Sequence, residues 1–227
     1  MASESKSFVC QPPVSPAAIQ PSLTNVVLLL QVALAFGLIL VAVWTLQGSF
    51  NRAVVLLATC LILASTVAGQ WGWRELGLAR PLRGAAVVLG SGILLVAVIS
   101  AAGAVVRVLG PPQALPWNKA WQYAIWALAQ EFILQSFIYV RLESVFGARR
   151  AVLYASLLFA VAHIPSPLLT ILSLLGALFF CEMFRRYRNL YPIGLVHGAL
   201  GLSIAASLPD SLLHHMRVGI GYLMYHH

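Results

Sequence analysis

Long apolar runs, separated by short basic segments, dominate the chain. About 20 apolar residues are enough for one helix to cross a bilayer, so most of the runs predict a single membrane-spanning helix. The longest run is too long for one helix, and Pro165-Ser166-Pro167 divides it, because proline interrupts a helix. Basic residues stand at both of its ends, which places both ends on one side of the membrane and predicts a hairpin. The runs cover residues 25–46, 53–71, 84–106, 117–140, 151–184 and 190–208, which predicts seven spans.

The two ends of the chain differ from this apolar middle. Residues 1–22 are polar and rich in proline, without the basic stretch and short apolar core of a signal peptide, and they predict a disordered tail. In residues 209–227 the apolar stretch Val218–Tyr225 is too short to cross a membrane. We therefore expect a membrane domain over residues 23–208 between two tails.

The composition leads to the same class of protein. Of the 227 residues, 60% are hydrophobic and 9% are charged, whereas soluble domains carry about 25% charged residues. This balance excludes a soluble enzyme, a secreted disulfide scaffold and a disordered regulator. The three cysteines form no disulfide framework. The expected fold class is all-α, a polytopic transmembrane helical bundle of about seven spans.

The basic residues predict how the bundle is oriented. The net charge of +8 comes from clusters between the apolar runs, which orient a membrane protein and contact lipid headgroups; nucleic acid is not expected as a partner. With seven spans, one side carries Lys6, Arg74, Arg80, Arg83, Arg141, Arg149, Arg150, Arg185, Arg186 and Arg188. The other side carries Arg52, Arg107, Lys119 and Arg217. Because basic loops stay in the cytoplasm, we expect the N-terminus inside and the C-terminus outside.

Three ionisable residues lie well inside apolar runs. Glu131 is the only acid at such depth, where an ionised group costs about 2.5–3.5 kcal/mol. His163 and His197 lie at similar predicted depths, counted at 1.5 Å per helical residue, so the three side chains could meet in one cavity. A carboxylate with two imidazoles can activate a water or bind a metal such as zinc. The alternative for each residue is a buried packing contact.

Other kinds of intramembrane protease site are missing from the sequence. It contains no HExxH motif, no second intramembrane acid for an aspartyl dyad, and no serine between Gly194 and Gly198. Since no serine or cysteine is expected beside the trio, attack by an activated water is the predicted reaction. That reaction requires no cofactor, although the sequence does not exclude zinc.

Three short motifs on separate apolar runs resemble those of a known family. They are Gln130-Glu131-Phe132-Ile133-Leu134-Gln135, then Phe159-Ala160-Val161-Ala162-His163, and finally His197 followed four residues later by Gly201. In order and spacing they resemble the EExxxR, FxxxH and HxxxN motifs of the CAAX protease and bacteriocin-processing family. These are Rce1-like, glutamic-type intramembrane proteases. The resemblance covers about residues 117–208 and would make the last four spans the catalytic core.

The resemblance implies roles for the matched ionisable residues. Glu131 and His163 would form the water-activating pair, and His197 would stabilise the oxyanion of the reaction. Phe159 completes the second motif and would support the site.

Three positions depart from the family pattern. Gln130 stands at the first Glu, Gln135 at the Arg, and Gly201 at the polar oxyanion partner. Because Gln cannot accept a proton, either Glu131 has taken over as the base or the chain is inactive; we expect an active variant. Gln130 would then orient the water or the substrate, and any second oxyanion donor would be backbone or solvent.

The resemblance implies an intramembrane endopeptidase that cleaves membrane-anchored proteins near a C-terminal anchor, in a bacterial inner membrane. A relative of the sorting-tag proteases called myxosortases fits this expectation. A non-catalytic protein of the same fold, acting as an immunity factor or scaffold, is the main alternative. A proton-coupled transporter is less favoured, because the first three apolar runs carry almost no polar residues.

Overall fold

The computed structural model describes residues 23–106, 111, 118 and 120–226, and within them the regular structure is helical, as predicted. The predicted tail 1–22, Lys6, Arg107, Trp117 and Lys119 lie outside these residues. The long helices are α1 (Leu23–Val43), α2 (Ser49–Ala68), α3 (Ala85–Val106), α7 (Pro167–Tyr187) and α8 (Leu190–Ser207). The shorter ones are α4 (Ala120–Glu131), the π-helix η3 (Phe132–Tyr139), α5 (Val140–Phe146), α6 (Ala148–Val161), α9 (Asp210–Leu213), α10 (Gly219–Leu223) and the 3₁₀ helices η4 (His214–Met216) and η5 (Met224–His226).

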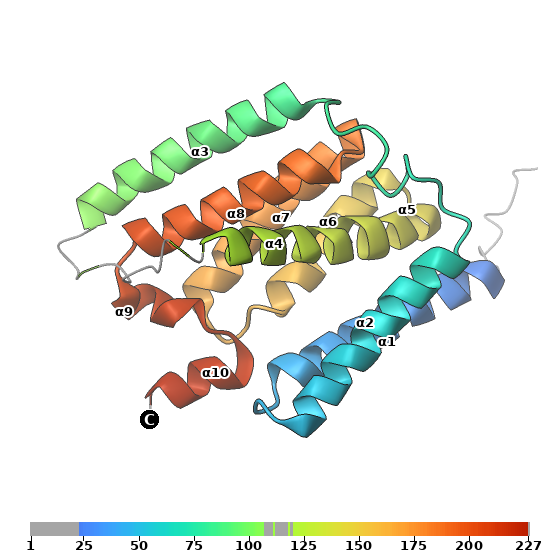
Figure 1. Cartoon of the computed structure of the whole chain (residues 1–227), viewed down its shortest axis with the longest axis horizontal. Coiled ribbons are helices and arrows are strands. Elements are labelled where there is room, and N and C mark those ends of the chain that lie inside the picture. The colour runs from blue at the N-terminus through green and yellow to red at the C-terminus, as the bar shows by residue number, and fades with distance from the viewer. Residues whose placement is uncertain (1–22, 107–110, 112–117, 119, 227) are drawn as a thin grey trace, which may run out of the picture.

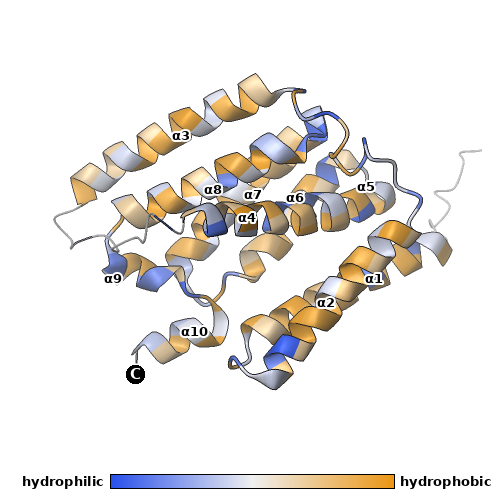
Figure 2. Cartoon of the chain, viewed as in Figure 1, coloured by the Kyte–Doolittle hydropathy of each residue, from blue (hydrophilic) through white to orange (hydrophobic). Residues whose placement is uncertain are grey.

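Five helices of the described chain, α1, α2, α3, α7 and α8, are long and apolar enough to cross a membrane. Figure 2 shows how apolar residues cover α1, α2 and α3. The other two predicted spans are less regular. One runs from α4 through η3 into α5, and the other is α6, whose 14 residues extend about 21 Å against a hydrocarbon core of about 30 Å. The number of spans beyond five remains a prediction.

The division of the longest apolar run is confirmed. α6 ends at Val161 and α7 begins at Pro167, where the missing N–H of proline costs nothing because the first turn of a helix has no partner for it. The two helices pack against each other. The prolines therefore create a helical hairpin out of one continuous apolar stretch.

Helix α8 lies between α3 and α4 and packs closely on both (Figure 1). Glycines make this approach possible: a Cβ at Gly92 would lie 2.5 Å from the Val196 side chain, and one at Gly194 would lie 2.5 Å from that of Leu128. Small residues at such contacts let helix backbones approach each other within a membrane. The packing brings the middle of α8 beside the end of α4, where Glu131 lies.

Four arginines from two basic segments, Arg74, Arg80, Arg83 and Arg188, surround one cavity at one end of the bundle. Arg188 forms an ion pair with Glu143 of α5 and donates to the backbone oxygen of Glu75 at 3.4 Å. At the opposite end, Gly219 lies against the backbone of Val43, so the C-terminal helices meet the connection between α1 and α2.

Arg141 corrects one part of the charge count. Its place beside an apolar run predicts a charge at the membrane surface, but Arg141 lies in α5 with a side chain that is 0% exposed. Its guanidinium donates to Oε1 of Gln31 at 2.9 Å, to the Phe137 oxygen at 3.1 Å and to the Ser65 oxygen at 2.9 Å. Arg141 therefore joins α5 to α1 and α2 instead of marking a loop.

Candidate active site

Glu131 is the last residue of α4, and its carboxylate is completely buried. Its Oε1 lies 2.7 Å from Nδ1 of His197 on α8. Its Oε2 accepts a hydrogen bond of 3.0 Å from Nε2 of Gln135. Both carboxylate oxygens are thus paired, which is what a buried carboxylate requires. The structure brings together three of the residues singled out from the sequence.

The hydrogen bond to Glu131 also orients the imidazole of His197. With Glu131 ionised, Nδ1 of His197 carries the proton of this bond, and Nε2 of the neutral ring is left as an acceptor. The ring is stacked on Phe180, with centroids 5.2 Å apart, and it meets the edge of Phe159 at 5.9 Å. His197 is therefore held on three sides, and among the described residues its Nε2 makes no hydrogen bond.

His163 lies just beyond the end of α6. Its Nδ1 is 2.7 Å from the backbone oxygen of Phe159. Because a carbonyl oxygen only accepts, Nδ1 donates and Nε2 of the neutral ring is again an acceptor. Its ring centroid is 4.7 Å from that of Phe159, so the same phenyl ring contacts both imidazoles. In the described part of the chain Glu131 makes no hydrogen bond to His163; its imidazole partner is His197.

Gln135 belongs to the π-helix η3, a feature that the apolar pattern did not predict. The N–H of Val140 donates to the oxygen of Gln135, five residues earlier. π-helical segments are rare and occur frequently at functional sites. The side chain of Gln135 is buried, and its Oε1 has no hydrogen-bond partner among the described residues. Gln135 thus supports Glu131 through its amide nitrogen.

Gly201 faces a side chain that sequence reasoning missed. A Cβ at Gly201 would lie 2.1 Å from Oη of Tyr123 on α4. The hydroxyl of Tyr123 therefore occupies the space into which a side chain at position 201 would extend, one helical turn beyond His197. No local pattern could have paired two residues so distant in sequence. The only signal was the lack of a polar side chain at Gly201, which left the position of an oxyanion donor open.

Two further expectations concern Gln130 and a metal. Gln130 is half-buried, and in the described part of the chain its side chain makes no hydrogen bond or ion pair. Glu131, not Gln130, thus makes the observed contacts. Among the described residues, no group of three or more His, Cys, Asp or Glu side chains is arranged to hold a metal ion.

Comparison with known families finds one similarity in this part of the chain. Residues 112–203 match the model of a family described as type II CAAX prenyl endopeptidase Rce1-like. The matched segment contains Glu131, His163 and His197, and the resemblance predicted from the three motifs is confirmed over it. The match covers less than half of the chain and shows a likeness of this segment to prenyl endopeptidases of the CAAX type. No curated protein and no solved structure matches the chain.

Proposed function

We propose that the protein is a glutamic-type intramembrane endopeptidase that cleaves membrane-anchored proteins near a C-terminal anchor. The observation that carries the proposal is the 2.7 Å hydrogen bond between the buried carboxylate of Glu131 and Nδ1 of His197. A carboxylate that holds one imidazole nitrogen orients the other for proton transfer and stabilises the imidazolium that forms. Here the reacting nucleophile is a water, and the catalytic core is the last four spans of a seven-span bundle.

The hydrogen bonds favour His197 as the residue that takes the proton of the water. Its Nδ1 faces a carboxylate, whereas Nδ1 of His163 faces a neutral carbonyl. A positive charge is therefore better stabilised on His197. Nε2 of His163 accepts the second hydrogen of the same water and orients it. Relative to the family resemblance, this assignment moves the proton-accepting role from His163 to His197 and leaves the oxyanion to another donor.

The proposed reaction has two proton transfers. In the first step the water oxygen bonds to the carbonyl carbon of the peptide while one water proton moves to Nε2 of His197. In the second step the C–N bond breaks, and the imidazolium returns that proton to the leaving nitrogen. The negative oxygen that exists between the two steps needs a hydrogen-bond donor, and the hydroxyl of Tyr123 beside Gly201 supplies it.

Tyr123→Phe should lower kcat by about 100-fold or more with little change in KM, since one oxyanion donor contributes about 10²- to 10³-fold. Gly201→Ala should have a similar effect, because the added Cβ displaces the Tyr123 side chain. Steady-state cleavage of a membrane-anchored peptide in detergent measures both parameters. Gly90→Ala is the matched control, because a Cβ there meets nothing within 4 Å. Unchanged kcat in Tyr123→Phe would remove the hydroxyl from the mechanism.

Gln130→Glu should retain or raise the cleavage rate. The substitution changes size and helix propensity little, and it adds a second carboxylate beside Glu131, which shifts the pH dependence because neighbouring like charges hinder each other's ionisation. The pH–rate profiles of the two proteins provide the comparison. A wild type that cleaves nothing, with activity only in Gln130→Glu, would favour the non-catalytic alternative for the natural chain.

We also propose that the N-terminus faces the cytoplasm and the C-terminus the opposite side, in a bacterial inner membrane. The gathering of basic segments at one end of the bundle supports this orientation. Reporter fusions at the two termini should report opposite sides. Reporters on the same side would require an even number of spans, with α6 as the first helix to reconsider.

A further inference from the structure

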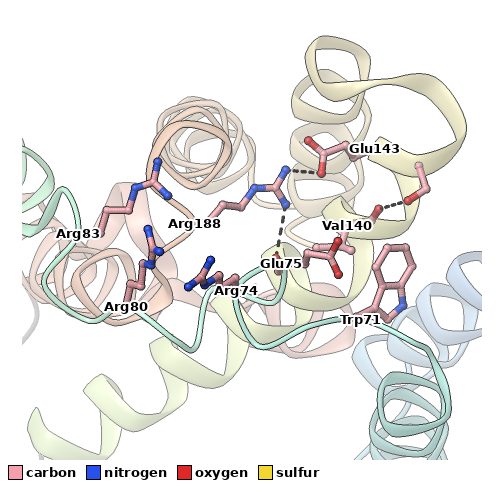
Figure 3. A pocket seen from close by; sticks show the side chains of 9 residues that line it. Trp71, Arg74, Glu75, Arg80, Arg83, Val140, Glu143 and Arg188 are labelled. Carbon is pink, nitrogen blue, oxygen red and sulfur yellow. Dashed lines mark hydrogen bonds and ion pairs between the residues drawn. The ribbon is translucent and has the colours of Figure 1, made fainter.

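A cavity of about 320 Å³ opens at the basic end of the bundle, apart from the Glu131 site. Val140 in its wall is nine residues from Glu131 along the helix, or about 14 Å. Figure 3 shows the cavity between the α2–α3 connection, α5 and the α7–α8 junction. Its lining residues are Trp71, Arg74, Glu75, Arg80, Arg83, Val140, Glu143, Ser144 and Arg188.

The lining carries an excess of positive charge that the protein does not neutralise. Glu143 is paired with Arg188, and Oε2 of Glu75 accepts from the N–H of Gly72 at 2.8 Å. The guanidinium groups of Arg74, Arg80 and Arg83 form no ion pair or hydrogen bond within the described chain, and the three side chains are exposed at the cavity. With Glu143 paired to Arg188, the other three guanidinium groups share the lining with the single carboxylate of Glu75, and this net positive lining is typical of an anion site.

The segment that carries these arginines is held in place by the protein core. Nδ2 of the buried Asn189 donates to the backbone oxygens of Pro81 at 2.7 Å and Arg83 at 2.9 Å. The buried Ser136 donates to the oxygen of Leu76 at 2.7 Å. The backbone of the α2–α3 connection is therefore anchored without any ligand. Such preorganisation lowers the entropic cost of binding.

The chemistry and position of the cavity together identify its ligand. Guanidinium groups match the geometry of phosphate oxygens and bind them bidentately. The cavity lies just beyond the ends of the apolar helices α2 and α8, where lipid headgroups are found, and Trp71 in its wall is of the residue type enriched at that level. We propose that the cavity binds the phosphate of an anionic phospholipid headgroup. This proposal depends on the protein being in a membrane and not on the proposed peptidase activity.

The test compares two pairs of arginines in the full chain, one that lines the cavity and one that lies outside it. Wild type, Arg80→Gln/Arg83→Gln and Arg149→Gln/Arg150→Gln are reconstituted in phosphatidylcholine nanodiscs that contain a minor fraction of phosphatidylglycerol. The protein is then released from the nanodiscs, and native mass spectrometry counts the lipid molecules that stay bound to it. Both variants lose two charges, and Arg149 and Arg150 are exposed outside the cavity. Both variants should have the thermal unfolding midpoint of the wild type. In Arg80→Gln/Arg83→Gln the backbone oxygens that Asn189 binds are kept, and in the control pair the replaced side chains are exposed.

We expect wild type to retain phosphatidylglycerol in preference to phosphatidylcholine. Retention should fall about tenfold or more in Arg80→Gln/Arg83→Gln, which removes two of the guanidinium groups, and stay within about twofold of wild type in the control pair. Equal losses in both variants would mean diffuse surface attraction and would overturn the proposal. A second arm titrates the lipid-free protein in detergent with inorganic phosphate. Binding as tight as that of the lipid would identify free phosphate as the ligand and equally overturn it.

Discussion

Replacing Glu131 with Gln is expected to lower kcat for peptide cleavage by about 10³- to 10⁴-fold. The amide can still accept a hydrogen bond from Nδ1 of His197, so the imidazole keeps its position. The neutral amide cannot stabilise the positive charge that forms on the imidazole of His197 when the water loses its proton. A loss of this size follows when the carboxylate behind a catalytic histidine becomes an amide. Since Glu131 makes its contacts within the core, Gln is the substitution that alters shape least.

Cleavage of C-terminally anchored candidate peptides by purified protein in nanodiscs measures this effect. His163→Ala in the same assay should lose about 10²- to 10⁴-fold, the usual contribution of one acid–base group. Thermal unfolding in detergent serves as the control for intact folding. If Glu131→Gln cleaves at close to the wild-type rate while both variants remain folded, water activation by the Glu131–His197 pair is wrong. If only His163→Ala is inactive, His163 is the base, as the family resemblance implies.

The apolar pattern predicted much of the fold because each helix in a membrane must satisfy its own backbone hydrogen bonds. The length of an apolar run then nearly determines the helix. The runs 25–46 and 84–106, for example, correspond to α1 (Leu23–Val43) and α3 (Ala85–Val106). The hairpin at Pro165-Ser166-Pro167 followed from local backbone chemistry in the same way. Neither inference required knowledge of which helices pack together.

The similar depths of Glu131, His163 and His197 allow the three side chains to meet, but depth alone does not determine which histidine binds the carboxylate; in the structure it is His197. Which histidine binds the carboxylate depends on which face α8 turns toward α4. That face is set by the close contact of the two helices at glycines such as Gly194. The contact of Tyr123 with Gly201 depends on the same packing. The π-helix was missed for another reason: its i+5 hydrogen bonds leave no distinct apolar period over only eight residues. Tertiary contacts, rather than local propensities, thus determine the site.

Arg141 illustrates the same limit, since its burial could not be inferred from a charge next to an apolar run. Its guanidinium contacts Gln31 of α1, the Ser65 oxygen of α2 and the Phe137 oxygen of η3. Its Cζ also lies 3.9 Å from the centroid of the Phe137 ring. One side chain thus connects three helices, and through η3 it stabilises the segment that follows Glu131.

Arg141→Met is therefore expected to reduce the free energy of unfolding by about 2–4 kcal/mol. A hydrogen bond to a charged group contributes about 1.5–3 kcal/mol, and each buried acceptor left unpaired costs about 1–3 kcal/mol. Part of this loss is offset, because Met fills most of the volume and the desolvated charge disappears. Arg141→Lys should recover little, since one ammonium group cannot reproduce the planar fork that reaches three acceptors.

Equilibrium unfolding of the full chain in mixed micelles measures the difference, with Arg149→Met as the control. Arg149 has the same kind of side chain and lies eight residues further along the chain, but this side chain is exposed, so its replacement should change the unfolding free energy by less than about 0.5 kcal/mol. A stability of Arg141→Met equal to that of the control would mean that α1 and α2 are held to the core by apolar packing alone. The expected larger loss would instead make the Arg141 contacts the polar link between the first hairpin and the helix that carries Glu131.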